Sequence, residues 1–128
     1  MTLLDILPII LYIIKLDRIN NIGKFTLLIM LNSIINLSFK QIIRQPRPKY
    51  KTNNSKYDTY GMPSGHAQAV WFIVFYNLNK TDERITVLLS LLAIGTCIQR
   101  IYTRRHTLEQ VIVGSLIGSM LGFMASKI

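Results

Sequence analysis

The sequence predicts an all-α protein, an integral-membrane helical bundle of four short transmembrane helices preceded by a short apolar helix. Half of the 128 residues, 50%, are apolar or aromatic, which excludes an intrinsically disordered chain. The charges are unevenly placed: 15 Lys and Arg outnumber 6 Asp and Glu, and long stretches contain none of them. Most basic side chains stand at the ends of apolar stretches or in one loop. This length is enough for one domain, residues 1–128, and not for two.

Residues 6–14 are the first apolar segment, but nine residues are too few to cross a membrane. We expect a tilted, re-entrant or interfacial helix here. The start of the chain lacks the basic region and cleavage site of a secretory signal peptide, so the segment is not expected to be removed. Residues 20–23 then predict a turn before the first long helix.

Four uncharged windows predict the transmembrane helices, at residues 25–39, 67–79, 85–99 and 110–126. A window of 15 residues gives a helix of roughly 22 Å, shorter than a hydrocarbon core of roughly 30 Å, so one window alone is equally typical of a buried helix in a soluble protein. A soluble domain of this size cannot hide four nearly all-apolar helices from water. Flanking Lys and Arg side chains also extend toward the membrane surface and lengthen each span. We therefore interpret all four windows as membrane spans.

Two patterns indicate how these helices pack. Gly114, Gly118 and Gly122 recur every four residues, and such small residues let two helix backbones approach closely in lipid. Asn32 and Asn36 share one face of the first long helix, and amides at this depth are expected to point into the bundle.

A polar loop is expected over residues 45–61, between the first two long helices. It contains prolines and several basic residues, and irregular backbone is not tolerated where it faces lipid. The loop must therefore lie outside the hydrocarbon. Trp71 and Tyr102 are expected at the membrane interface, where amphipathic aromatic rings gather.

Helix direction places the chemistry-bearing residues on one face of the membrane. Because successive spans run antiparallel, the ends of the first and third long helices lie beside the starts of the second and fourth. These ends carry cations, two histidines and a serine: Lys40, Arg47, Ser64, His66, Arg100 and His106. Converging cations beside histidines indicate a pocket for a concentrated anion such as a phosphate or diphosphate. The helix start at 64–66 would add backbone N–H donors.

Three motifs within residues 40–110 resemble those of the type 2 phosphatidate phosphatase superfamily. They are Lys40-x6-Arg47-Pro48, Pro63-Ser64-Gly65-His66 and Arg100-x5-His106, in that order. The neighbouring residues are most similar to the dolichyl diphosphatase branch, in particular Gly61-Met62, Ala67-Gln68, Arg100-Ile101-Tyr102 and Gln110. Two positions depart from the commoner pattern of the superfamily: Gln99 stands where Ser is usual, and Gln110 where Asp is usual. Only the second fits the dolichyl diphosphatase branch.

The resemblance implies a role for each motif residue. His106 would be the nucleophile that forms a phosphohistidine, and His66 the general acid that protonates the leaving oxygen. Five groups would hold the phosphate: the side chains of Lys40, Arg47 and Arg100, and the helix start at Ser64 and Gly65. Gln110 and Glu109 are both candidates for the group that orients the His106 ring, and we expect it to be Gln110.

The function expected from this resemblance is hydrolysis of the terminal phosphate of a polyprenyl, dolichyl-type diphosphate. The alternatives are a phosphatidate-type monoester phosphatase and a non-catalytic protein that binds lipid phosphates. A basic membrane anchor for nucleic acid is a third class, but the cations do not line a helix face, so no nucleic-acid partner is expected. The resemblance also implies an internal membrane of endoplasmic-reticulum type, with the site on the lumenal or external face.

No metal or other cofactor is expected, because the acidic residues are scattered and no Cys or His cluster accompanies them. The expected partners are the lipid substrate and the bilayer, and the sequence indicates no obligate protein partner. The single cysteine, Cys97, lies in an apolar run and is expected to be a buried hydrophobe.

Overall fold

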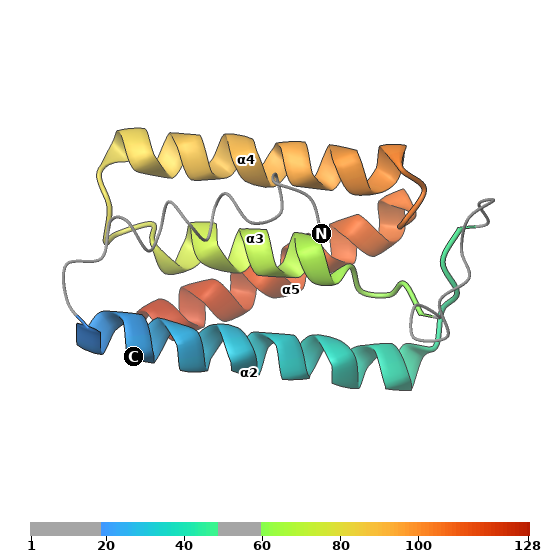
Figure 1. Ribbon diagram of the computed structural model, residues 1–128, viewed down its shortest axis with the longest axis horizontal. Coiled ribbons are helices and arrows are strands. Elements are labelled where there is room, and N and C mark those ends of the chain that lie inside the picture. Colours follow the sequence, from blue (N-terminus) through green and yellow to red (C-terminus); the bar gives the residue numbers. More distant parts are fainter. Residues whose placement is uncertain (1–18, 49–59) are drawn as a thin grey trace.

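The computed structural model describes residues 19–48 and 60–128, and this part of the chain is helical (Figure 1). Its helices are α2 (Ile19–Ile43), α3 (Gly65–Tyr76), α4 (Glu83–Tyr102) and α5 (Leu108–Ser126). These four match the four predicted windows and confirm the all-α bundle, but the turn predicted at residues 20–23 is wrong, because α2 already includes these residues. The helix expected over 6–14 and most of the loop expected over 45–61 lie outside the described residues.

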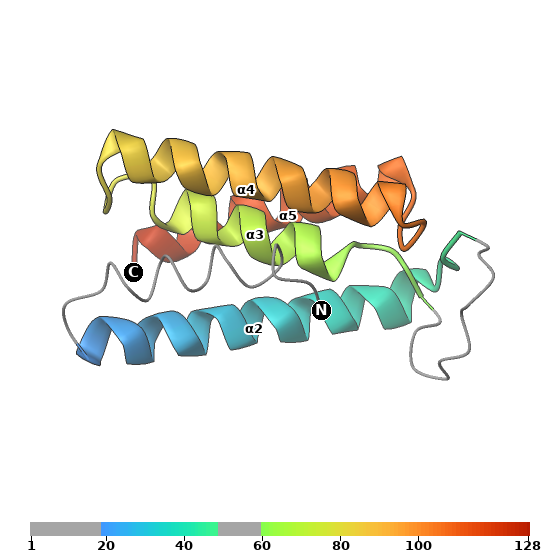
Figure 2. The same cartoon turned by 45° about the horizontal axis from the view of Figure 1, so that its top comes forward.

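Three of the described helices are long and apolar enough to cross a membrane: α2 from Gly23, α4 and α5. The fourth, α3, has 12 residues and is therefore about 18 Å long, shorter than a hydrocarbon core of roughly 30 Å, so the segments on either side of it complete its path between the two ends of the bundle. It lies in the middle of the bundle and contacts each of the other three helices (Figure 2). The second predicted span is thus a short central helix, which its neighbours cover over most of its surface.

Hydroxyl and carboxylate caps start three of the helices. The Ser64 hydroxyl accepts a hydrogen bond from the backbone N–H of Ala67, and the Asp82 carboxylate accepts one from Ile85. At the start of α5, Thr107 and Gln110 form a reciprocal capping box. These side chains satisfy first-turn N–H groups that have no partner inside the helix.

The predicted glycine stripe packs α5 against α3. A Cβ atom added at Gly114 would come within 2.5 Å of the Ser64 carbonyl oxygen, and Gly118 and Gly122 are held closer still to α3. The three glycines face the backbone of α3 in register, at Ser64, Gln68 and Phe72. Each step is four residues on both helices, so α3 and α5 run parallel with their backbones in contact, as the small-residue pattern predicts.

Because of this register, α3 begins further inside the bundle than α5 does. The start of α3 lies level with Gly114, six residues into α5, which corresponds to about 9 Å along the helix. At the other end, the same register brings Tyr76 level with Ser126, and these are the last residues of their helices. The whole difference in length is therefore at the end where α3 begins.

A buried amide network joins α2 to α3. The Asn36 side chain donates hydrogen bonds to the Gln68 Oε1 atom at 2.9 Å and to the Pro63 carbonyl at 3.2 Å. Gln68 in turn donates to the Asn32 side chain at 2.9 Å. Both asparagines are buried, as predicted. Because Pro63 directly precedes the cap of α3, this network also fixes the segment that enters α3.

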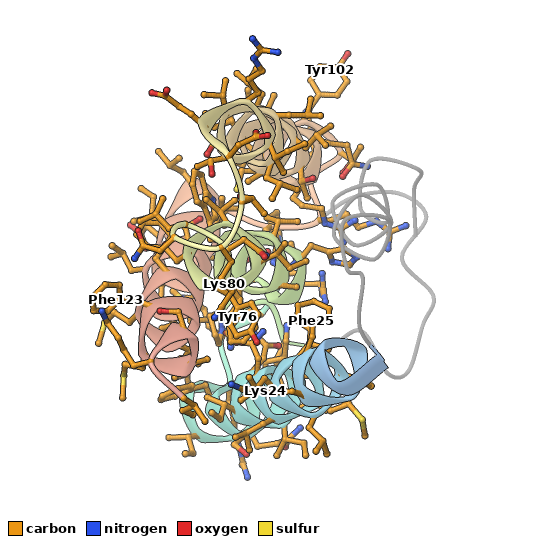
Figure 3. All side chains as sticks on the ribbon, turned by 90° about the vertical axis from the view of Figure 1, so that its left-hand side faces the viewer. Lys24, Phe25, Tyr76, Lys80, Tyr102 and Phe123 are labelled. Atoms are coloured by element: carbon orange, nitrogen blue, oxygen red, sulfur yellow. The ribbon has the colours of Figure 1, made fainter. Side chains whose placement is uncertain are left out.

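The opposite end of the bundle is closed by aromatic packing (Figure 3). Tyr76 stacks on Phe72 and contacts Phe25 of α2, and the Lys80 ammonium lies 5.0 Å from the Tyr76 ring centroid. Tyr102 instead points outward and is 87% exposed, in keeping with the predicted interfacial position.

The predicted interfacial position of Trp71 is wrong. Trp71 lies in the middle of α3 and is partly buried, with its indole N–H 3.4 Å from the Cys97 sulfur on α4. Because α3 is the central helix, a side chain at its midpoint points at a neighbouring helix rather than at the membrane surface. Cys97 is only partly buried, and it accepts this indole N–H.

Candidate active site

Four helix ends meet at one end of the bundle, where α2 and α4 finish and α3 and α5 begin, at the right of Figure 1. Contacts between the segments confirm this proximity, because the Ser64 N–H donates to the Gln110 carbonyl at 3.1 Å and His106 contacts Gly61. The expectation that both histidines and the motif cations share one end of the molecule is therefore met.

The turn after α4 holds His106 close to Arg100. Arg104 has a φ of 57°, and this left-handed residue reverses the chain directly after α4. The Arg100 carbonyl then accepts two hydrogen bonds, from the N–H of Arg105 at 3.1 Å and from that of His106 at 3.3 Å. The third motif is thus a helix end and its closing turn, which explains why its cation and its histidine are found together.

The His106 ring is held from both sides. It is 2% exposed, its Nδ1 atom lies 3.0 Å from the Gly61 carbonyl, and its Nε2 atom lies 3.1 Å from an Arg47 guanidinium nitrogen. A carbonyl only accepts hydrogen bonds and a guanidinium only donates them. The proton of the neutral ring is therefore assigned to Nδ1, and the Nε2 lone pair points toward Arg47.

The surroundings of His106 keep its ring neutral. Burial and, to a smaller extent, the positive charges of Arg47, Lys40 and Arg100 together lower the pKa of His106 from 6.5 to about 3, although the hydrogen bond to Gly61 raises it. Both causes disfavour the imidazolium, because it would be a poorly solvated cation among other cations. At neutral pH the Nε2 atom therefore carries no proton, and its lone pair accepts the hydrogen bond from Arg47.

Arg47 and Lys40 are positioned by the two chain segments at the base of the polar loop. Pro46 pairs with Tyr60, and the Gly61 N–H donates to the Gln45 carbonyl at 2.8 Å. Arg47 also donates to the Arg105 carbonyl at 3.0 Å. Lys40, one turn from the end of α2, reaches the Tyr60 carbonyl at 3.2 Å. The two cations of the first motif are thus tied to the second and third motifs.

Ser64 differs from its expected role. It is fully buried, its N–H donates to the Gln110 carbonyl, and its hydroxyl caps α3. These groups hold the helix start in place, so the expected phosphate contact from the Ser64 N–H is not available. Gly65 and His66, both half-buried, form the first turn of α3 beyond this cap. Arg100 is buried in the last turn of α4, and its expected contact with phosphate stays a prediction.

The expectation that Gln110 orients His106 is also wrong. The Gly61 carbonyl occupies the Nδ1 side of the ring, while the Gln110 amide bonds to Thr107, Gln45 and Pro46. The spacing argument fails because α5 begins at Leu108, so His106 precedes the helix and a four-residue step does not bring the two side chains together. Glu109, the other candidate, is exposed on the first turn of α5.

Sequence reasoning missed two residues of this site, Gly61 and Gln45. A Cβ atom at Gly61 would come within 2.5 Å of the Gln110 amide, so a larger residue here would have to displace that side chain. A glycine just before the second motif was the available signal. Gln45 gave no signal, because its contact with Gln110 joins segments that are 65 residues apart.

Within residues 19–48 and 60–128, no group of three or more His, Cys, Asp or Glu side chains is placed to hold a metal ion. The expectation of metal-independent chemistry stays a prediction.

Fold and site together define a helical membrane protein with a neutral, buried histidine among cations at one end of its bundle. The chain belongs to the PAP2 superfamily, which residues 21–128 match. This confirms the family to which the three motifs pointed.

Two curated relatives carry the name that the motif neighbours suggested. The chain is 37% identical over 108 residues to the dolichyldiphosphatase of Saccharomyces cerevisiae, and 30% identical over 108 residues to dolichyldiphosphatase 1 of Homo sapiens. The alignments cover 73% and 71% of this chain and 45% of each relative, so the chain spans about half the length of these relatives.

A solved structure shares the fold. The crystal structure of Aquifex aeolicus LpxE is similar with a TM-score of 0.76 and 27% sequence identity. The superposition covers 96% of this chain and 77% of that one.

Proposed function

We propose that this chain is a membrane lipid phosphatase that removes the terminal phosphate of a polyprenyl, dolichyl-type diphosphate. The observation that carries the proposal is the state of the His106 ring. The ring is buried and neutral, and its Nε2 atom faces the guanidinium of Arg47. Membership of the PAP2 superfamily and the similarity to two dolichyldiphosphatases support the reaction and the substrate class. We also propose that the site lies on the lumenal or external face of an endoplasmic-reticulum-type membrane, and the same similarity supports this.

In the proposed reaction, the Nε2 lone pair of His106 attacks the terminal phosphorus. The N–P bond forms as the bond from phosphorus to the bridging oxygen breaks, and His66 protonates that oxygen as the lipid monophosphate leaves. A water molecule then attacks the phosphohistidine, gives its proton to His66 and releases inorganic phosphate. Lipid diphosphate and water thus yield lipid monophosphate and phosphate.

The cations would supply most of the stabilisation that phosphoryl transfer needs. Lys40, Arg47 and Arg100 surround His106 closely enough to lower its pKa, so the phosphate that His106 attacks would meet the same three charges. The guanidinium of Arg47 donates to Nε2 in this structure. It would turn to a phosphate oxygen as substrate binds, and that movement would expose the lone pair for attack.

The test is phosphate release by the purified chain in lipid vesicles. We expect turnover of short and long polyprenyl diphosphates to exceed that of phosphatidate, and His106→Ala to abolish it. With substrate labelled in the terminal phosphate, acid-labile label should appear on the wild-type protein and not on His106→Ala. Arg84→Ala, which removes an exposed cation at the far end of α4, is the matched control and should keep full activity.

Two other outcomes would replace the proposal. Faster turnover of phosphatidate would identify a monoester phosphatase. Binding of lipid phosphate without turnover would identify a non-catalytic lipid-phosphate-binding protein.

A further inference from the structure

The Gln110 side chain joins its own helix start to the segment that leads into Arg47, and it uses both of its hydrogen-bond donors to do so. It is fully buried, and its amide nitrogen donates to the Gln45 Oε1 atom at 2.8 Å and to the Pro46 carbonyl at 2.9 Å. Its oxygen accepts the Thr107 N–H at 3.0 Å. An amide nitrogen has two protons, so both are committed to the segment that leads into Arg47.

The segment of residues 45–46 leads into Arg47, the cation that contacts the Nε2 atom of His106. Pro46 is covalently bonded to Arg47, whose guanidinium lies 3.1 Å from the His106 Nε2 atom. The other neighbour of Gln110 is Gly61, whose missing side chain leaves room for the amide. Gln110 therefore lies between the segment that carries Arg47 and the segment that accepts the His106 Nδ1 proton.

We propose that Gln110 is a positioning residue that acts through Arg47, setting the guanidinium against Nε2 of His106. The inference rests on the proposed function, in which Nε2 is the nucleophile. This role explains why the side chain at position 110 is an amide. The Gln45 Oε1 atom and the Pro46 carbonyl oxygen both face it, so it must donate two hydrogen bonds. A carboxylate has no proton to donate and would repel both oxygens.

The decisive comparison uses two substitutions. Gln110→Met keeps the length of the side chain but removes both donors, and we expect kcat/KM to fall about 10- to 100-fold, as for other supporting hydrogen bonds in catalytic sites. Gln110→Asp restores the acid that is commoner in the superfamily at this position, and we expect no rescue. If instead Gln110 acted directly on His106, Gln110→Asp would keep or raise the activity, and the proposal would be overturned.

A double-mutant cycle then tests the route through Arg47. In an Arg47→Ala background, Gln110→Met should change the remaining kcat/KM by less than about threefold, because the group that it positions is gone. If the kcat/KM losses of the two single variants instead multiply in the double variant, Gln110 acts on a group other than Arg47. If Gln110→Met does not fold, Gln45→Ala replaces it in the cycle, since it removes one of the two hydrogen bonds without touching α5.

Two further measurements separate positioning from stability and from the proposed reaction. Thr107→Ala removes the other half of the capping box, so it should lower the thermal midpoint while kcat/KM per folded molecule is kept. Diphosphate binding by calorimetry should weaken in Gln110→Met only when Arg47 is present. Binding that follows this pattern without any turnover would support the positioning role and refute the proposed reaction. Equal binding in all variants would refute the positioning role.

Discussion

His106 acquires its chemical state from neighbours that are remote in sequence. The Gly61 carbonyl lies 45 residues away along the chain and Arg47 lies 59 residues away, yet together they assign the ring proton to Nδ1 and direct the Nε2 lone pair. No carboxylate is needed for this orientation, because a backbone carbonyl serves as the acceptor. A neutral acceptor also leaves the positive charges of the site uncompensated at the ring, which suits a site for a polyanion.

The lowered pKa of His106 predicts a pH dependence of stability. The unfolded chain protonates this ring near pH 6.5, whereas the folded protein does so only near pH 3. Between these values unfolding takes up a proton, so the contribution of His106 is complete above pH 6.5 and is lost as the pH falls. By pH 4.5 the loss is about 2–3 kcal/mol.

The measurement is the thermal midpoint of unfolding in detergent micelles between pH 7 and 4.5, for the wild type and for His106→Asn. We expect the wild-type midpoint to fall more steeply, because the variant has no ring to titrate. Parallel curves for the two proteins would contradict a buried neutral imidazole.

At the scale of elements, two kinds of contact attach α3 to its neighbours. Backbone packing along the glycine stripe joins it to α5, and the amide network of Asn32, Asn36 and Gln68 joins it to α2. Both contacts act directly on the second motif, because Gly114 packs on Ser64 and Asn36 bonds to Pro63. The same interactions that hold the bundle together therefore also position the site.

The glycine stripe predicts a large cost for a single methyl group. Gly118→Ala places a Cβ atom against the Gln68 backbone, which cannot give way as a flexible side chain could. We expect the free energy of unfolding to fall by about 1–3 kcal/mol. The matched control is Gly23→Ala in α2, where nothing lies within 4 Å of the added atom and the better helix former should stabilise by about 0.5–1 kcal/mol.

Thermal unfolding of both variants in the same detergent is the measurement. A Gly118→Ala protein as stable as the wild type would show that α3 and α5 are further apart than the structure has them.

Several elements followed from the sequence because they depend on local patterns. Uncharged windows, helix direction and the four-residue glycine spacing predicted the helices, their shared end and the α3–α5 contact. The position of Trp71 was missed because it depends on α3 being the central helix, which no local pattern shows. The partners of Gln110 were missed because they depend on where α5 begins relative to a distant segment. α5 starts at Leu108, and Gln45 lies beside its first turn only once the loop base has paired.

At the scale of the whole molecule, the two ends of the bundle differ, and under the proposed function one of them is the reactive end. Cations and histidines gather where α2 and α4 finish, and an aromatic cluster around Tyr76 closes the other end. Because α2, α4 and α5 are each long and apolar enough to cross a membrane, we expect these ends to lie on opposite faces.

This polarity is testable by labelling single cysteines in sealed, uniformly oriented vesicles. On a Cys97→Ser background, Arg44→Cys and Glu109→Cys place thiols at exposed positions of the reactive end, and Asn79→Cys places one at the other end. A membrane-impermeant maleimide should label the first two together, and Asn79→Cys only after the membrane is opened, or the reverse. Labelling of all three from one side would contradict the arrangement.

The recessed start of α3 has a consequence for how substrate arrives. Measured along α5, Ser64 lies about 9 Å from the start of that helix, toward the middle of the bundle. The groups beside Ser64 are therefore expected closer to the hydrocarbon than the start of α5 is. A phosphate tethered to a long isoprenoid can reach that depth while its tail stays among the surrounding acyl chains. Under the proposed function, encounter would then be a two-dimensional search within one leaflet, and its rate would follow the number of substrate molecules per unit of membrane area.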